Sequence, residues 1–353
     1  MTESDWVSSV LSSINSWDKK HVVVSPDIDG ILCASLICHT FDSKIVGAYD
    51  GRFLIVFDGF TSLDVKNALW LDHDISQPGI ISIGQHLINH SDSDELPLRD
   101  SRSFNPNQFY NQTWKNSFKK GNLPEGGFDK YPFGTIHLLV EALNVSTPKR
   151  LTEHYHLLAH ADGTWAVCNE HVENAKRWKK EMFPLGNSLI DYLISDYTKH
   201  EANWYAHKSL IQELSEWVDR STAASVEAMD IPEWNRFRGN QSVKFNLTHW
   251  KKLDSGRPSN WMKKLCGLID YISEKTNWSV NAPKVISEIH LGQILELGGS
   301  SQVLNGEFDN FMIREQIFSH AIVSGGCMRF TKNLLINDNS IISLKHIEID
   351  TLV

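Results

Sequence analysis

The fold is decided by residues 22–30, which read VVVSPDIDG. Three β-branched residues predict a strand, and the glycine opens the apolar stretch 30–40, GILCASLICHT, which predicts a helix. Alternate residues of an extended strand exit face the same side, so Asp27 and Asp29 can converge on one cation. Hard divalent cations prefer oxygen ligands of this kind. The alternative is a helix N-cap, which aspartate also favours and which one of the two residues would fill.

Four later apolar runs also end in polar or acidic residues. They are KIVGAYDG at 44–51, FLIVFDG at 53–59, ALWLDHD at 68–74 and IISIGQH at 80–86. Their lack of polar alternation predicts strands buried on both faces, as in parallel sheets covered by helices. The ligand crevice of such a sheet lies beyond the carboxyl ends of its strands, where the acidic residues fall. We therefore expect an α/β fold whose parallel sheet has helices on both faces.

A chain of 353 residues favours two domains over one, because a single hydrophobic core usually stops growing at about 250 to 300 residues. Residues 1–170 carry the strand pattern and are predicted to form the domain that holds the site. Residues 171–238 have helical periodicity and predict a connector. Residues 239–353 combine short strand-like runs with a helix near 258–274, and they predict a smaller α/β domain that binds substrate.

The composition is that of a soluble globular protein, with 41% hydrophobic and 22% charged residues. The net charge is −9, from 34 basic and 43 acidic residues, and no basic run stands out. This balance argues against a long duplex footprint, since such binding depends on many phosphate contacts. A short or single-stranded nucleic acid or a nucleotide is compatible with it, because bound cations invert the local charge.

The remaining patterns concern the cellular localisation of the protein and the state of its cysteines. The N-terminus lacks a secretory signal and instead predicts an amphipathic helix with Trp6, Val10 and Ile14 on its apolar face. No apolar stretch reaches the roughly 18 to 20 residues that span a bilayer, so we expect a cytoplasmic protein without membrane contact. The five cysteines include no Cys-x-x-Cys pair and predict free, mostly buried thiols.

Three more motifs follow Asp27 and Asp29 along the chain. They are Asp72-His73-Asp74, then Gly84-Gln85-His86 with Asn89-His90 and Asn105-Pro106 after it, and then Asp162-Gly163-Thr164-Trp165 behind the apolar stretch that ends at His160. Residues 133–139, FGTIHLL, predict a helix before the last of them. In the order and spacing of these motifs, the chain resembles the DHH phosphoesterase family over roughly residues 20–170.

The resemblance implies a site of two divalent cations, Mn²⁺ or Mg²⁺, that activates water against a phosphoester. The metal ligands that it implies are Asp27, Asp29, Asp72, Asp74, His86 and Asp162. His86 and His90 would act near the phosphate, as ligand or as proton donor to the leaving oxygen. Substrate contacts are expected from Asn105, Thr135, His160 and Arg329. For the glycine-rich segment 324–329 around Arg329, an ordinary tight turn is the alternative.

The chain departs from the family pattern in two places. Val23 stands where family members place a metal-binding histidine, and Gly84-Gln85-His86 stands in place of Asp-His-His. Two kinds of function therefore stay open. One is a metal-dependent phosphodiesterase or exonuclease acting on short or single-stranded nucleic acid or on a nucleotide. The other is a catalytically inactive scaffold, as a homo-oligomer or as a subunit of a larger nucleic-acid-processing or defence complex.

Overall fold

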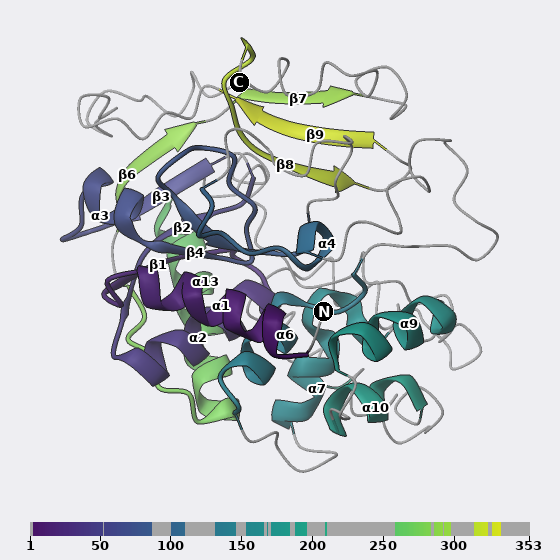
Figure 1. Ribbon diagram of the computed structural model, residues 1–353. Coiled ribbons are helices and arrows are strands. Elements are labelled where there is room, and N and C mark those ends of the chain that lie inside the picture. The colour runs from purple at the N-terminus through teal and green to yellow at the C-terminus, as the bar shows by residue number, and fades with distance from the viewer. Residues whose placement is uncertain are drawn as a thin grey trace.

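Figure 1 shows the computed structural model of the chain, in which a six-stranded sheet packs against helices and a three-stranded sheet lies beyond it. The structure describes residues 3–51, 53–86, 100–109, 131–145, 153–165, 168, 171–183, 188–195, 209, 258–283, 286–291, 293–297, 314–323 and 327–332. The larger sheet runs in the order β5-β4-β1-β2-β3-β6. Its strands are β1 (His21–Val24), β2 (Lys44–Tyr49), β3 (Phe53–Phe57), β4 (Leu69–Leu71), β5 (Ile81–Ile83) and β6 (Ile286–Leu291).

Most neighbours in the larger sheet are parallel. β5, β4, β1 and β2 pair in parallel, whereas β3 is antiparallel both to β2 and to β6. The antiparallel step follows from the short connection between β2 and β3, where Gly51 takes a positive φ of 91°. The expectation of an α/β fold with a mostly parallel sheet is confirmed.

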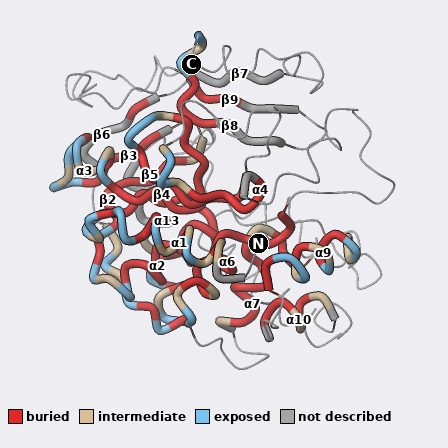
Figure 2. Tube along the Cα trace, in the orientation of Figure 1, coloured by how far each residue is buried: buried red, intermediate tan, exposed pale blue. Residues whose placement is uncertain are grey.

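Both faces of the larger sheet are buried, as the unbroken apolar runs predict (Figure 2). Val22 and Val24 belong to the main hydrophobic core, while Val23 between them packs on the opposite face with residues such as Trp70. This alternation follows from the two-residue period of a strand. Val23 is fully buried in that second cluster, so apolar packing accounts for the residue at this position.

Helices lie on both faces, in unequal layers. The main core is covered by α1 (Glu3–Ser16), α2 (Ile28–Phe41), α6 (Thr135–Ala142), α7 (Glu153–His160) and α13 (Pro258–Thr276). The opposite face is covered by α3 (Ser62–Asn67), through Val65, and by Phe318 of β8 (Ile317–Val323). The short helix α4 (Pro106–Phe109) follows the segment that pairs with β5.

The predicted amphipathic N-terminal helix is confirmed as α1. Trp6, Val10 and Ile14 are buried in the main core. The indole N–H of Trp6 donates to the carbonyl of Met182 at 2.9 Å, which ties α1 to α9 (Val172–Met182). Residues of α9 and of α10 (Ser188–Ser195) belong to the same core, so these helices of the predicted connector pack on the first unit.

Two elements from the last third of the chain also belong to the unit of the larger sheet. The helix expected near 258–274 is present as α13, and its residues Leu265 and Leu268 lie in the main core. β6 pairs with β3 at the edge of the larger sheet. The second sheet consists of β7 (Gln293–Leu297), β9 (Cys327–Lys332) and β8, in the order β7-β9-β8. The predicted domain boundary near residue 239 lies outside the described residues.

The two sheets are joined next to β4. The backbone N–H of Ser76 donates to the carbonyl of Phe318 at 2.7 Å, and Ile75 forms a bridge with Ser319. The hydroxyl groups of Tyr49 and Ser319 lie 2.7 Å apart. The second sheet is thus anchored to the segment that leads away from the carboxyl end of β4.

Two smaller expectations can be compared with the described residues. Cys33, Cys38, Cys168 and Cys266 are free thiols, and the first three are buried, as predicted. A search of the described helices found none whose length and apolarity would let it cross a bilayer.

Candidate metal centre

The site lies where the strand order of the larger sheet reverses. The chain passes from β1 through α2 to β2 on one side of β1, and later from β3 through α3 to β4 on the other side. The two helices pack on opposite faces of the sheet. Such a reversal between parallel neighbours is where open α/β sheets bind their ligands, beyond the carboxyl ends of the strands. Asp27 follows β1 at this edge and Asp72 follows β4.

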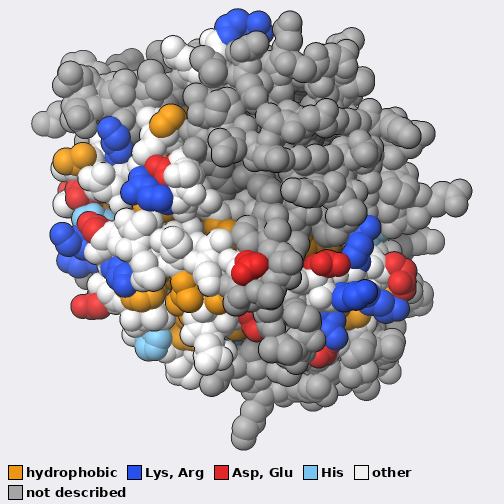
Figure 3. Space-filling model, viewed as in Figure 1, with side chains coloured by type: hydrophobic (Ala, Val, Ile, Leu, Met, Phe, Trp, Pro, Cys, Tyr) orange, Lys and Arg blue, Asp and Glu red, His pale blue; other side chains and the backbone are white. Residues whose placement is uncertain are grey.

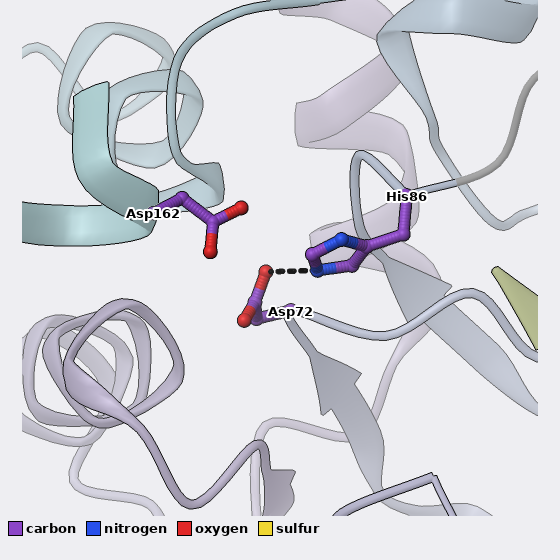
Figure 4. Close-up of side chains that lie close together, drawn as sticks. All are labelled: Asp72, His86 and Asp162. Atoms are coloured by element: carbon purple, nitrogen blue, oxygen red, sulfur yellow. Dashed lines mark hydrogen bonds and ion pairs between the residues drawn. The ribbon is translucent and has the colours of Figure 1, made fainter. Parts of the chain in front are cut away.

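Three side chains from separate segments converge here. Asp72 follows β4, His86 follows β5, and Asp162 lies in the 3₁₀ turn η1 (Ala161–Gly163) that continues α7. One ligand atom from each lies within 4.8 Å of the others. Figure 4 shows the three groups pointing toward a common centre, with Nε2 of His86 at 3.1 Å from Oδ1 of Asp72. The arrangement presents two carboxylates and one imidazole to a single point.

Asp72 is held in place but keeps one free oxygen. Its backbone takes a left-handed conformation with φ of 58°, and its N–H donates to the carbonyl of Ile83 at 2.8 Å. Oδ1 accepts the hydroxyl of Thr135 at 2.8 Å. Oδ2 is buried and has no hydrogen-bond partner among the described residues. A buried carboxylate oxygen without a partner is costly and points to a missing cation or donor.

Asp162 is positioned by a residue that the sequence did not single out. The side-chain amide of Gln85 donates to Oδ2 of Asp162. Gln85 is itself buried, and its backbone carbonyl accepts a hydrogen bond from the side-chain amide of Asn107 at 2.7 Å. Asp162 also has a left-handed backbone, with φ of 51°. The signals for Gln85 in the sequence are its place beside His86 at the end of a predicted strand and its place in Gly84-Gln85-His86, which stands where the family has Asp-His-His.

Asp29 uses both carboxylate oxygens to bind the start of α6. Oδ2 accepts the backbone N–H of Thr135 at 2.7 Å, and Oδ1 accepts that of Ile136 at 2.9 Å. These are among the first N–H groups of the helix, which have no partner within it. Gly134 is needed beside them, because a Cβ atom there would lie 2.8 Å from Oδ2 of Asp29. Asp29 therefore holds α6, and with it Thr135, against the site.

Asp27 is the N-cap of α2, accepting the N–H of Gly30 on Oδ1 at 3.0 Å. The capping alternative was expected to fit one of the two aspartates, and both in fact bind helix N-termini, each of a different helix. A Cβ atom at Gly30 would lie 2.3 Å from the carbonyl oxygen of Ser25, so the turn requires glycine. A metal-binding role for Asp27 and Asp29 stays a prediction.

Asp74 holds the backbone of His86 instead of pointing a free oxygen at the centre. Oδ2 accepts the N–H of His86 at 2.8 Å, and Oδ1 accepts the side-chain amide of Asn105 at 2.7 Å. Gly84 allows this turn, because a Cβ atom at that position would lie 2.4 Å from the carbonyl oxygen of His73. Asp74 and Asn105 thus fix where the imidazole of His86 is placed.

Burial and mutual repulsion disfavour the ionised carboxylates. Burial raises the pKa of Asp72 to about 6, against the opposing effect of His86, and the charges of Asp27 and Asp162 raise it further. Burial also raises the pKa of Asp29 well above its usual range, and so do the charges of Asp72 and Asp162. A bound cation would relieve this repulsion. The donor set of two carboxylates and one imidazole fits a divalent cation.

Comparison of the chain with family models, with curated proteins and with solved structures found no match. The resemblance to DHH phosphoesterases therefore stays a prediction, and the geometry of the site is what bears on function. Of the predicted ligands, the structure brings together Asp72, His86 and Asp162. Predicted substrate residues Asn105 and Thr135 hold the carboxylates of Asp74 and Asp72.

The other predicted residues lie elsewhere or outside the described chain. His160 is the last residue of α7 and is buried, and burial lowers the pKa of its ring to about 3, so it is neutral near pH 7. Arg329 lies in β9 of the second sheet, in register with Glu296 of β7 and Ala321 of β8. His90 lies outside the described residues.

Proposed function

We propose that this chain is a divalent-cation-dependent hydrolase of phosphodiester bonds in short or single-stranded nucleic acid or in nucleotides. The observation that carries the proposal is the convergence of Asp72, His86 and Asp162 on one point. The buried Oδ2 of Asp72, which has no partner among the described residues, supports it. The three residues would hold the cation, with Mn²⁺ preferred and Mg²⁺ as the alternative. One cation is what these ligands support directly. A second, as the family resemblance implies, would take its ligand atoms from Asp27 or Asp29, whose carboxylates also accept backbone N–H groups.

The residues around the ligands have positioning roles. A bound divalent cation supplies an activated water and charge stabilisation at the phosphoryl oxygens. Thr135 orients Asp72 through its hydroxyl, and Gln85 orients Asp162 through its amide. Asp74 fixes the backbone at His86. Because each candidate ligand has its own support, the three donors are held in place before any cation arrives.

The surface is consistent with a small substrate. On the face drawn in Figure 3, Lys and Arg side chains of the described residues are interspersed with Asp and Glu. The whole chain is acidic, with a net charge of −9. A long nucleic acid would need a continuous row of cationic contacts to its phosphates. A short oligonucleotide or a nucleotide, held chiefly at the cation, does not.

A catalytically inactive scaffold is the second candidate, and specific contacts favour it. Both oxygens of Asp29 and one of Asp27 accept backbone N–H groups of helices, which gives these carboxylates a structural role. Gln85 bonds to Asp162, at the edge of the candidate cation site. A scaffold of this kind would act through a protein partner in a larger nucleic-acid-processing assembly, or as a homo-oligomer.

Cation binding and hydrolysis measured on the same protein separate the two candidates. Calorimetry measures Mn²⁺ binding. Cleavage is measured on a panel of substrates that contains end-labelled single strands, short oligonucleotides and cyclic dinucleotides. The Asp72→Asn variant should lose both properties, while Asp58→Asn, an exposed aspartate after β3, should keep both. Mn²⁺ binding without cleavage of any substrate favours the scaffold. Absence of Mn²⁺ binding to the wild-type protein removes the hydrolase proposal.

A further inference from the structure

A cavity of about 300 Å³ lies between α1 and the segment 100–105. This segment runs beside β5, since Phe104 forms a bridge with Ile83. The lining is rich in serine, with Ser12 and Ser13 from α1 and Ser101 from the opposite wall. Ser9, Ser103, Arg102 and Asn105 are the other polar residues of the lining. The proposed function uses none of the serines.

The cavity is connected to the candidate metal centre by a short chain of hydrogen bonds. Asn105 lines the cavity and donates its side-chain amide to Oδ1 of Asp74 at 2.7 Å. The other oxygen of Asp74 accepts the N–H of His86 at 2.8 Å. Asn105 is only 2% exposed, so its position is fixed by packing and by these bonds. A molecule in the cavity would therefore lie next to the residues that place His86.

The charge of the cavity favours a neutral ligand. Nε and Nη2 of Arg102 donate to the two carboxylate oxygens of Asp100 at 2.8 and 2.7 Å. These bonds lower the pKa of Asp100, so the pair stays ionised and its charges cancel. A phosphate dianion would meet no net positive charge from this pair. Three of the five N–H groups of Arg102 remain, two on Nη1 and one on Nη2, and no hydrogen bond from Nη1 to another described residue is present.

The hydroxyl groups suit a ligand that itself carries hydroxyls. Ser13 donates to the carbonyl of Ser9 at 3.1 Å, which leaves its oxygen as an acceptor. Ser12 and Ser101 make no hydrogen bond to other described residues, and each offers a donor and an acceptor. Sugar hydroxyls match such a mixture, because they also donate and accept. The volume is at the lower end for small-ligand sites, enough for one sugar ring with part of its base.

We propose that this cavity binds the ribose of the nucleotide next to the scissile phosphate and so selects RNA over DNA. The proposal rests on the proposed function, since it names the substrate of the same site. The 2′-hydroxyl is the group by which proteins distinguish the two nucleic acids. Ser12 and Ser101 bind the sugar, and Asn105 links the bound nucleotide to the support of His86.

The test measures nucleoside binding to the cation-free full-length protein by NMR titration. Adenosine should bind about fivefold more tightly than 2′-deoxyadenosine, the effect of one hydrogen bond. Ser12→Ala and Ser101→Ala should each weaken adenosine binding and bring the ratio of the two affinities toward one. Ser8→Ala, at an exposed position of α1 outside the cavity lining, should leave both affinities unchanged. Equal affinities for the two nucleosides, or binding of inorganic phosphate in place of adenosine, overturn the proposal.

Two further measurements distinguish this proposal from the hydrolase itself. Asp72→Asn should keep the preference for adenosine, because Asp72 does not line the cavity. If the variant keeps that preference while the wild-type protein cleaves no substrate, the ribose-binding proposal is supported and the hydrolase proposal is wrong. If RNA and DNA oligonucleotides of one sequence are cleaved at equal rates, the hydrolase stands and the ribose site falls.

Discussion

Thr135 donates its backbone N–H to Asp29 at 2.7 Å across 106 residues of sequence, and it donates its hydroxyl to Asp72 at 2.8 Å. One residue at the start of α6 therefore links Asp29, which caps the helix, with Asp72, which belongs to the candidate metal centre. The backbone bond serves the fold, and the hydroxyl serves the site. These two roles can be separated by mutation, because they use different atoms.

Replacement of Asp29 should chiefly affect stability. Asp29→Ala leaves the N–H groups of Thr135 and Ile136 buried without acceptors, and we expect the free energy of unfolding to fall by about 2 kcal/mol. Asp29→Asn keeps one acceptor oxygen, so its free energy of unfolding should fall by a smaller amount. Urea denaturation in the absence of cations measures both. If Asp29→Ala unfolds at the same urea concentration as wild type, the capping role is wrong.

Replacement of Thr135 should chiefly affect cation binding. Thr135→Val keeps the backbone bond to Asp29 but removes the hydroxyl that orients Asp72. We expect Mn²⁺ affinity to fall about tenfold, as is usual when a residue that orients a metal ligand is lost. Thr135→Ser restores a hydroxyl and should bind nearly as tightly as wild type. Calorimetric titration tests this, and equal affinities of the Val and Ser variants would count against the role.

The pKa of Asp72 predicts how stability depends on pH when no cation is present. Because folding raises this pKa from 3.8 to about 6, the folded state binds the proton more tightly than the unfolded state does. Deprotonation of Asp72 therefore lowers the free energy of unfolding as pH rises from about 4 to about 6. Above pH 6 the whole of this reduction is present. The size of the effect is about 2 to 3 kcal/mol at pH 7.

Asp72→Asn should remove this loss. In EDTA at pH 7 the variant should be more stable than wild type, whereas near pH 4 the two should be similar. In millimolar Mn²⁺ the order should reverse at pH 7, because only the wild-type protein gains stability from the bound ion. Chemical denaturation at the two pH values, with and without Mn²⁺, tests all four comparisons. A variant that is less stable than wild type in EDTA at pH 7 contradicts the charge argument.

Part of the candidate site could be predicted from the sequence because strand exits are local features. The strand-exit pattern predicted that Asp72 and His86 would lie at one edge of the sheet, whereas Asp162 was predicted from the motif order of the family resemblance; the structure brings the three together. The sequence did not separate ligands from caps, since an aspartate before a helix fits both roles. For Asp29 the capping role depends on a contact with the start of α6, which is distant in the sequence. The pairing of β6 with β3 was missed for the same reason.

Gln85 provides the last test, because it contacts a candidate ligand without itself being charged. Its amide donates to Asp162, and Gln85→Leu removes this bond while keeping a side chain of similar size. The backbone carbonyl that accepts Asn107 is unaffected, so the fold should persist. We expect Mn²⁺ affinity to fall about tenfold.

Gln85→Glu should act in the opposite direction. A carboxylate beside Asp162 adds repulsion in the cation-free protein, so the free energy of unfolding in EDTA should fall. The same added charge attracts a divalent cation, so Mn²⁺ affinity should rise above that of wild type. Electron paramagnetic resonance titration of free Mn²⁺ measures affinity in both variants. Opposite shifts in the Leu and Glu variants place the cation next to Gln85, whereas unchanged affinity in both would mean that Mn²⁺ binds away from Asp162.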